Sequence, residues 1–225
     1  MANKQEQEET AIEKLNSNLT SAGEKIANNK KTISLIISGI AVVAAAVVAY
    51  VFLYHQPQTN KAFEAYNQVE VSATGNDSIA AIEYKKVAEA YSSTDAGKLA
   101  YLSAAESFYN TGKYKEAVEC LDKFSTSEKV LDASAMVLKG DCFVNLKKYD
   151  DAIASYEKAV SAAGENIQIV PRVLLKEANV YDEQKKFDKA LECYERLAKE
   201  YPTFELGNGA AIDSYIAREK ARLGK

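Results

Sequence analysis

The sequence predicts an all-α protein in which a single transmembrane helix precedes a solenoid of stacked helical repeats. The first observation is a run of 23 residues, 32–54, that contains no charged side chain. The second is a similar helical motif that occurs four times between residues 77 and 202 at a nearly constant period. The third is the scarcity of helix breakers, because ten glycines and three prolines in 225 residues are few.

Residues 1–31 form a polar segment with five lysines and five glutamates. Its apolar residues step by three and four positions, as on one side of a helix. They are Ile12, Leu15, Leu19, Ala22 and Ile26. Because so short a stripe does not hold a helix in water, we expect a disordered tail with transient helix.

Residues 32–54, TISLIISGIAVVAAAVVAYVFLY, are predicted to span a membrane. As a helix they extend about 34 Å, which exceeds the ~30 Å of a hydrocarbon core. Tyr50, Phe52 and Tyr54 suit the aromatic belt at a membrane interface. The apolar stretch is longer than the core of a cleavable signal peptide, so we expect a permanent anchor.

Basic residues near the two ends of this segment predict its orientation. Lys25, Lys30 and Lys31 precede it, whereas Lys61 is the one basic residue other than His55 in the twenty that follow. The positive-inside rule then keeps the tail in the cytoplasm and places residues 56–225 on the other side. In a bacterium this arrangement means a single-pass inner-membrane protein with a periplasmic domain.

Small residues recur along one face of the apolar segment. They are Ser34, Ser38, Ala41, Ala45 and Ala49. In lipid, close backbone approach across small residues is a main source of helix association. We therefore expect this face to bind a membrane partner, and chance alignment of common alanines is the alternative.

Four segments share one helical motif: DSIAAIEYKKVAEAY, GKYKEAVECLDKF, KKYDDAIASYEKA and KKFDKALECYERLAKEYP. The alanine that opens each helix lies at positions 80, 117, 152 and 190, so the spacings are 37, 35 and 38 residues. Small and aromatic residues follow at offsets that fall on one side of a 3.6-residue helix. A period of this length indicates stacked helical repeats, each of which needs its neighbours to bury its apolar face.

The helices of the repeats are expected in pairs separated by tight turns. QPQT at 56–59 is expected to break the helix, and TGND at 74–77 to form a turn with Asp77 or Ser78 as the helix cap. The turns within pairs are marked by Gly112 and by the Lys-Lys sequences at 147–148 and 185–186. The expected helices are 60–72, 98–110 with 113–124, 132–146 with 149–162, 170–184 with 187–201, and a polar closing helix, 210–223.

The composition argues against an enzyme and against a nucleic-acid-binding protein. The net charge of −4 offers no basic surface for nucleic acid. The single histidine, His55, leaves no histidine-dependent zinc site or Ser-His-Asp triad for the repeats. The sequence contains no nucleotide-binding glycine loop, no paired catalytic carboxylates and no metal-ligand cluster, so we expect neither catalysis nor a cofactor.

The three cysteines lie inside predicted helices. Cys120 and Cys193 hold the same place in their repeats, two repeats apart, which is too far for a disulfide. Cys142 and Cys120 fall in adjoining helices, so a disulfide between them is conceivable. We interpret all three as small buried apolar residues.

The stretches 98–131, 133–166 and 171–204 resemble tetratricopeptide repeats, and 60–91 resembles a divergent first copy. The matching positions are the small Ala105, Gly140 and Ala178, the aromatic Phe108, Phe143 and Tyr181, the ring after the turn at Tyr114, Tyr149 and Phe187, the small Ala117, Ala152 and Ala190, and Pro202. No repeat has the family's tryptophan, and Leu121 and Phe124 depart from its pattern. The resemblance implies a right-handed solenoid whose concave face is built by the first helix of each pair.

Carrying over the groove positions of that family gives nine candidate residues for binding a partner. They are Leu102, Glu106, Tyr109, Val137, Asp141, Val144, Leu175, Asn179 and Asp182. Repeats that clamp an acidic chain terminus use lysine and asparagine where Leu102 and Glu106 stand, and only Arg172 and Lys176 offer cations. The resemblance therefore implies an apolar groove with an acidic edge, suited to a hydrophobic or basic segment. Ordinary solvated surface is the alternative interpretation.

The layout of tail, span and repeats resembles the YfgM-like ancillary subunits of the bacterial Sec translocon. That resemblance implies protein partners, namely translocon subunits, periplasmic chaperones and unfolded exported clients. We also expect the repeat region to form a monomer or a weak homodimer. Two other classes stay open: a structural scaffold of an envelope complex, and an import-receptor-like repeat protein facing the cytosol.

Overall fold

The computed structural model describes residues 20, 29–206 and 211–224 of the chain. The chain divides into two compact units, Met1–Pro57 and Gln58–Lys225, and each is described by itself. Most of the predicted tail, 1–31, lies outside the described residues.

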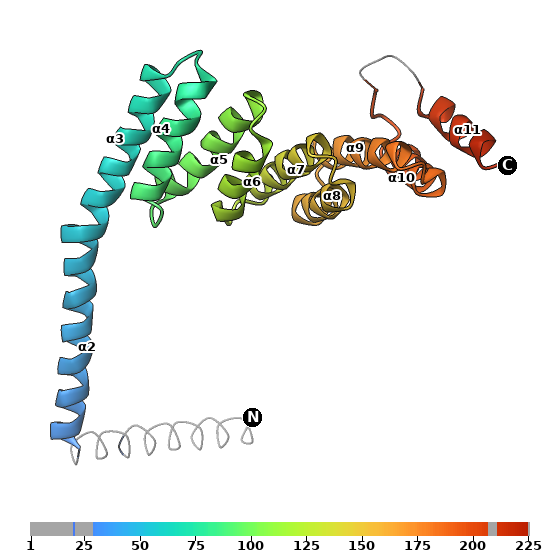
Figure 1. The fold of residues 1–225 in the computed structure, drawn as a ribbon. Helices are drawn as coiled ribbons and strands as arrows, with labels where there is room; N and C mark the ends of the chain where they lie inside the picture. The colour runs from blue at the N-terminus through green and yellow to red at the C-terminus, as the bar shows by residue number, and fades with distance from the viewer. Residues whose placement is uncertain (1–19, 21–28, 207–210, 225) are drawn as a thin grey trace, which may run out of the picture. The chain divides into compact units, whose positions relative to one another are not determined.

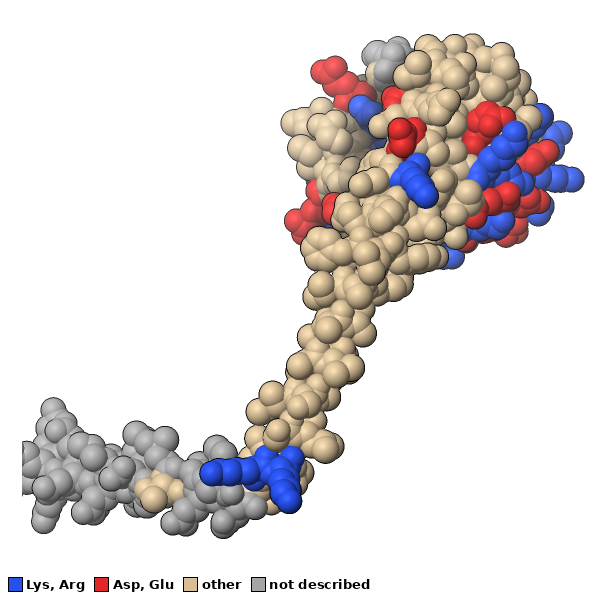
Figure 2. Space-filling model, turned by 90° about the vertical axis from the view of Figure 1, so that its left-hand side faces the viewer, with Lys and Arg blue, Asp and Glu red and all other residues tan. Residues whose placement is uncertain are grey.

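The first unit contains one long apolar helix. α2 (Lys30–Tyr50) continues into the π-helix η1 (Val51–His55), and no residue of either is buried. By length and composition, the helical stretch that holds them is apolar enough to cross a membrane, with a mean hydropathy of 2.6 in its most apolar window. Figure 2 shows charged side chains at the start of α2, which holds Lys30 and Lys31, and an uncharged surface along the rest of that helix.

The predicted helix break at QPQT is wrong. The helical backbone passes through this sequence, and α3 (Gln56–Ser72) begins directly after η1. In the wider turn of η1, the backbone N–H of Gln56 bonds to the carbonyl of Val51, five residues back. Pro57 lacks an N–H and crowds the carbonyl four residues before it. A π turn at this point loosens the hydrogen-bond pattern, so the helix accommodates the proline without ending.

The second unit is a stack of paired helices, followed in Figure 1 from α3 to α11. No strand occurs among the residues that the structure describes. After α3 the helices are α4 (Asp77–Ala90), α5 (Asp95–Asn110), α6 (Tyr114–Lys123), α7 (Lys129–Asn145), α8 (Tyr149–Ala163), α9 (Val170–Glu183), α10 (Phe187–Glu200) and α11 (Ile212–Arg222). The prediction of an all-α solenoid is confirmed, and the bounds of the paired helices agree with the expected ones within three residues.

The alanines that open the second helices are buried inside the stack. Ala117, Ala152 and Ala190 have no exposed surface, and Ala80 is 8% exposed. Buried aromatic residues pack beside them, including Tyr156, which is 1% exposed. Small residues at these positions let the two helices of a pair approach, and the larger side chains of the next helix fill the remaining space.

The turns within pairs all use one residue in the left-handed backbone region. Gly75 and Gly112 do so with φ of 75° and 76°, and Lys147 and Lys185 do so with φ of 59° and 58°. The cap of α4 is Asn76, whose side chain accepts a hydrogen bond from the N–H of Ile79. The expected caps Asp77 and Ser78 are therefore wrong by one and two residues, because the turn at Gly75 places Asn76 at the helix entrance.

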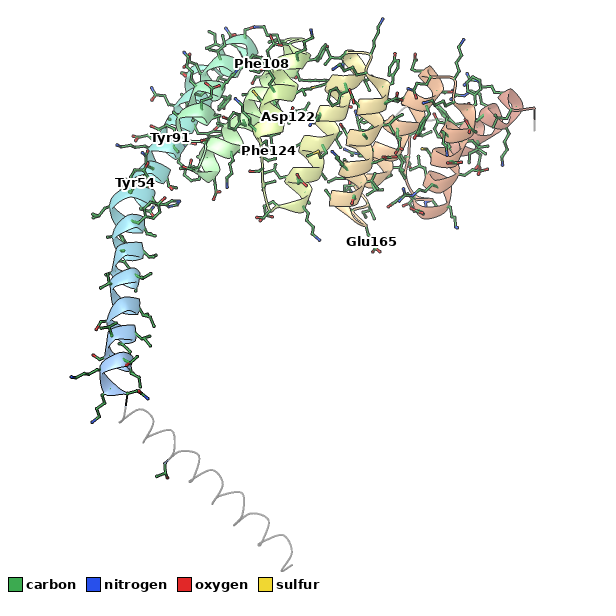
Figure 3. The ribbon with its side chains drawn as sticks, turned by 60° about the horizontal axis from the view of Figure 1, so that its bottom comes forward. Tyr54, Tyr91, Phe108, Asp122, Phe124 and Glu165 are labelled. Carbon is green, nitrogen blue, oxygen red and sulfur yellow. The ribbon has the colours of Figure 1, made fainter. Side chains whose placement is uncertain are left out.

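Apolar side chains lie in the interior of the stack, and most charged side chains lie at its edge. Phe108 and Phe124, 5% and 9% exposed, lie among the helices, whereas Glu165 projects from the loop after α8 (Figure 3). The three cysteines are free and buried, as interpreted from the sequence. Burial raises the pKa of Cys120 to about 11 and that of Cys142 and Cys193 to about 12, so these thiols stay protonated at neutral pH.

Candidate partner-binding groove

The nine predicted groove residues lie on the first helices α5, α7 and α9, but they are not equally accessible. Leu102 is 6% exposed and belongs to the apolar core, so its side chain supports the groove from behind. Val137 and Leu175 are half-buried, whereas Glu106 and Asn179 are exposed. Accessible groove surface is therefore concentrated toward the C-terminal halves of these helices.

A hollow of about 280 Å³ opens between the ends of α5, α7 and α9. Four predicted residues line it: Tyr109, Asp141, Val144 and Asn179. The other lining residues are Asn145, Tyr156, Lys176, Val180 and Glu183. Asn145 and Glu183 were not predicted from the sequence, although each lies one helical turn beyond a predicted residue, a spacing that places both on the same helix face.

Asp141, in the lining of this hollow, is held by two partners. The ammonium group of Lys176 donates to its two carboxylate oxygens at 2.8 and 2.9 Å. The hydroxyl of Tyr156 donates to Oδ1 at 2.6 Å. Burial and the adjacent Asp141 carboxylate raise the pKa of Tyr156, so its proton stays in the hydrogen bond. Asp141 is thus positioned and charge-compensated within the chain.

A hydrogen bond from a tyrosine of the second helix to a groove residue of the first helix also occurs in the next repeat, but not in the previous one. In α9 and α10, the hydroxyl of Tyr194 donates to Oδ1 of Asn179 at 3.2 Å. In α5 and α6, Leu121 occupies the position of the tyrosine, and Glu106 forms no hydrogen bond or ion pair with any residue that the structure describes. Desolvation by the surrounding protein raises the pKa of Glu106 although the residue is exposed overall.

Asp182 is covered by α11 instead of facing a partner. Arg218 and Arg222 of α11 each approach its carboxylate to 2.5 Å. Glu219, with no exposed surface, pairs with both arginines. Desolvation raises the pKa of Asp182, and the two arginines oppose that shift. The C-terminal end of the groove is therefore closed by the chain's own helix, packed where the first helix of a further repeat would lie.

The acidic edge expected for the groove is smaller than its sequence suggests. Asp141 and Asp182 are neutralised by Lys176 and by the α11 arginines. Within the described part of the chain, Glu106 and Glu183 are the groove carboxylates without an ion pair. No group of three or more metal-ligating side chains occurs among the described residues.

The fold and the groove define a solenoid of the tetratricopeptide type, and comparison with known proteins agrees. Residues 171–204 match the family model described as tetratricopeptide repeat. Residues 73–159 match the model described as anaphase-promoting complex, cyclosome, subunit 3. No curated protein matches the chain significantly. The chain is therefore a tetratricopeptide-repeat protein, and its repeats are protein-interaction modules.

Solved structures share this fold at low sequence identity. A crystal structure of MamA protein is 21% identical, with a TM-score of 0.57, over 74% of this chain and 83% of that one. A second MamA structure is 22% identical, with a TM-score of 0.55, over 68% and 81% of the two chains. BtubC (BKLC) from P. vanneervenii is 14% identical, with a TM-score of 0.52, over 75% and 84%. At these identities the likeness concerns the fold alone.

Proposed function

We propose that the chain is a membrane-anchored protein-interaction module whose groove binds extended segments of partner proteins. The observation that carries the proposal is the hollow between α5, α7 and α9, which is open to solvent and lined by three successive first helices. Repeats of this kind are generally non-catalytic, and the lining residues offer packing and hydrogen bonds without a nucleophile and base. The module therefore acts by binding.

The apolar helix α2 supports attachment to a membrane. Its exposed side chains include Leu35, at 77%, and Ile40, at 64%, which water solvates poorly. Under the positive-inside rule, Lys30 and Lys31 at its start keep that end in the cytoplasm and direct the repeats to the periplasm. The small residues Ser34, Ser38, Ala41, Ala45 and Ala49 are the proposed contact with a membrane partner.

The proposed biological setting is the bacterial inner membrane beside the protein-export channel. There the groove would hold unfolded segments of exported clients and pass them to periplasmic chaperones. The layout of tail, span and repeats supports this setting, as does a groove whose walls are largely apolar. A structural scaffold of an envelope complex remains the alternative, and it requires no groove that binds clients.

Photo-crosslinking in intact membranes tests this proposal. A photoreactive residue replaces Asn145, which is exposed and lines the hollow, in the full chain. The matched control replaces Glu165, which points away from the stack. We expect adducts with exported proteins from position 145 and few from position 165. Equal adducts from both positions, or none from either, contradict a client groove.

The same membranes test the proposed setting. Translocon subunits are expected to co-purify with the chain and to be lost from a variant with Ala41→Leu and Ala45→Leu, which inserts normally because its hydrophobicity rises. Co-purification of an envelope complex in their place supports the scaffold. A reporter that is active only in the cytoplasm, fused after residue 225, is expected to be inactive; activity contradicts the proposed orientation.

A further inference from the structure

We propose that the hollow between α5, α7 and α9 receives one cationic side chain, lysine or arginine, from an otherwise apolar segment of the partner. This inference rests on the proposed function and names the chemistry of the segment that the groove selects. The aliphatic stem of that side chain packs on Tyr109 and Val144, and its charged end pairs with Glu183.

The size and walls of the hollow fit one long side chain. Its volume of about 280 Å³ exceeds the ~30 Å³ share of a water molecule roughly ninefold, so it holds more than isolated solvent. Val144 gives it an apolar wall with the buried Val180 behind, and the ring of Tyr109 is steadied by an edge contact with Tyr114 at 5.5 Å between centroids. Lysine and arginine bury their methylene stems on such surfaces and keep the charge at the rim.

The charges around the hollow are unbalanced in favour of a cation. One cation, Lys176, stands against two carboxylates, those of Asp141 and Glu183. Lys176 is engaged by both oxygens of Asp141, whose Oδ1 also accepts from Tyr156. Glu183 is exposed and has no ion pair with any residue in the described ranges 29–206 and 211–224. One negative charge is therefore left for a ligand.

Two other carboxylates of the groove form ion pairs with cations of the next helix in the stack. Asp141 is paired with Lys176 of the following first helix, and Asp182 is paired with Arg218 and Arg222 of α11. In both places a cation from the next layer of helix completes the groove. Glu183 is the carboxylate lining the hollow for which the described chain supplies none, so a cation from a bound segment would complete the same pattern.

An acidic ligand fits this site poorly. A carboxylate entering the hollow would meet Glu183 and would have to displace Asp141 from Lys176, which leaves a half-buried carboxylate without its partner. The site therefore discriminates by attraction for cations and by repulsion of anions, which together give specificity.

Fluorescence anisotropy with labelled peptides and the full chain in detergent micelles tests this inference. The probe is an unstructured ten-residue peptide of leucine, valine and serine with one central arginine, about 33 Å when extended. Two matched peptides carry glutamine or glutamate at the centre. We expect the arginine peptide to bind about tenfold more tightly than the glutamine peptide, and the glutamate peptide to bind most weakly.

Glu183→Gln is the decisive variant, because an exposed side chain can be changed without disturbing the core. It is expected to remove most of the arginine preference and to leave the affinity for the glutamine peptide unchanged. Glu165→Gln is the matched control and should change neither affinity. An arginine preference that survives Glu183→Gln, or no preference at all, overturns the inference while client binding stands. Failure of all three peptides to bind contradicts the proposed function itself.

Discussion

The helix pairs α5–α6 and α7–α8 share their packing and differ in the polarity of their groove face. Both pairs close on an alanine with no exposed surface, Ala117 in the first and Ala152 in the second. In α7–α8, Tyr156 donates a hydrogen bond to the groove residue Asp141. In α5–α6 the equivalent positions hold Leu121 and Glu106, and no such bond forms.

The two pairs also differ in whether the following first helix supplies a cation to the groove carboxylate. Asp141 is paired with Lys176 of α9, whereas the position of α7 that corresponds to Lys176 holds Leu138. The pKa of Glu106 is raised because the surrounding protein desolvates its carboxyl, and no described residue forms an ion pair with it. The repeat therefore specifies how helices pack, whereas single residues outside the repeated core decide which groove carboxylates are hydrogen-bonded and paired.

The largest expected effect comes from Gly140→Ala. A methyl group at this position would lie 2.3 Å from Cε1 and 2.5 Å from Cδ1 of the Tyr156 ring. That ring is 1% exposed and tied to Asp141, so it has little room to move. We expect a loss of about 1–3 kcal/mol in the free energy of unfolding, measured by urea denaturation, despite the better helix propensity of alanine.

A double variant tests whether the Tyr156 ring is what excludes a methyl group at position 140. Gly140→Ala with Tyr156→Leu recreates the pairing of Ala105 and Leu121 found in α5–α6. The double variant should lose less stability than the two single changes together, because the leucine leaves space for the added methyl group. Full additivity, or a Gly140→Ala variant that is more stable than the wild type, would show that the ring is not confined.

An intermediate loss of stability is expected from Tyr156→Phe, which removes the hydroxyl that donates a hydrogen bond to Asp141. A hydrogen bond to a charged group contributes about 1.5–3 kcal/mol, and a bond between neutral groups about 0.5–1.5 kcal/mol. Tyr156→Phe should therefore lower the free energy of unfolding by about 2 kcal/mol and Tyr194→Phe, whose acceptor is Asn179, by about 1 kcal/mol. Chemical denaturation of both variants measures the difference, and equal losses would contradict the role of the Asp141 charge.

The smallest expected effect concerns the turns. Lys147 and Lys185 adopt the left-handed backbone that Gly112 adopts in α5–α6. Both lysines are exposed, so replacing each with glycine removes backbone strain and little contact. We expect Lys147→Gly and Lys185→Gly each to stabilise the protein by about 0.5 kcal/mol, the strain relieved being partly offset by the greater chain entropy of glycine. Thermal melting checks this, and destabilisation would mean that the lysine side chains hold the turn.

Periodicity explains why the helices could be predicted so closely. A small residue such as Ala152 recurs at each repeat, and an apolar stripe follows it on one helical face. This pattern predicts both the helix and the side of it that is buried. The groove residues Asp141 and Val144 could also be placed, because a repeat register carries positions from one helix to the next. Glu183 and Asn145 were missed because each lies one residue beyond the last position that the family register carries over, Asp182 in one helix and Val144 in the other.

Two local errors have a common physical cause. The sequence QPQT contains a helix breaker, and TGND contains three residues that cap helices well, so composition alone left the outcome open. The π turn of η1 accommodates Pro57, and the left-handed Gly75 selects Asn76 as the cap. Both outcomes depend on the backbone geometry of the neighbouring residues, which composition does not specify.

The amino-acid sequence was sufficient to predict an all-α fold, one helix apolar enough for a membrane, and repeats that bury alanines at a nearly constant period. Those properties depend on local spacing, which one chain displays completely. The tertiary structure was needed to show that Leu102 is core, that Asp182 is covered by α11, and that Glu183, beside a hollow, has no ion pair with any described residue. Pairing and burial of charges depend on which side chains other helices bring within a few ångströms, and no periodicity along the chain specifies that.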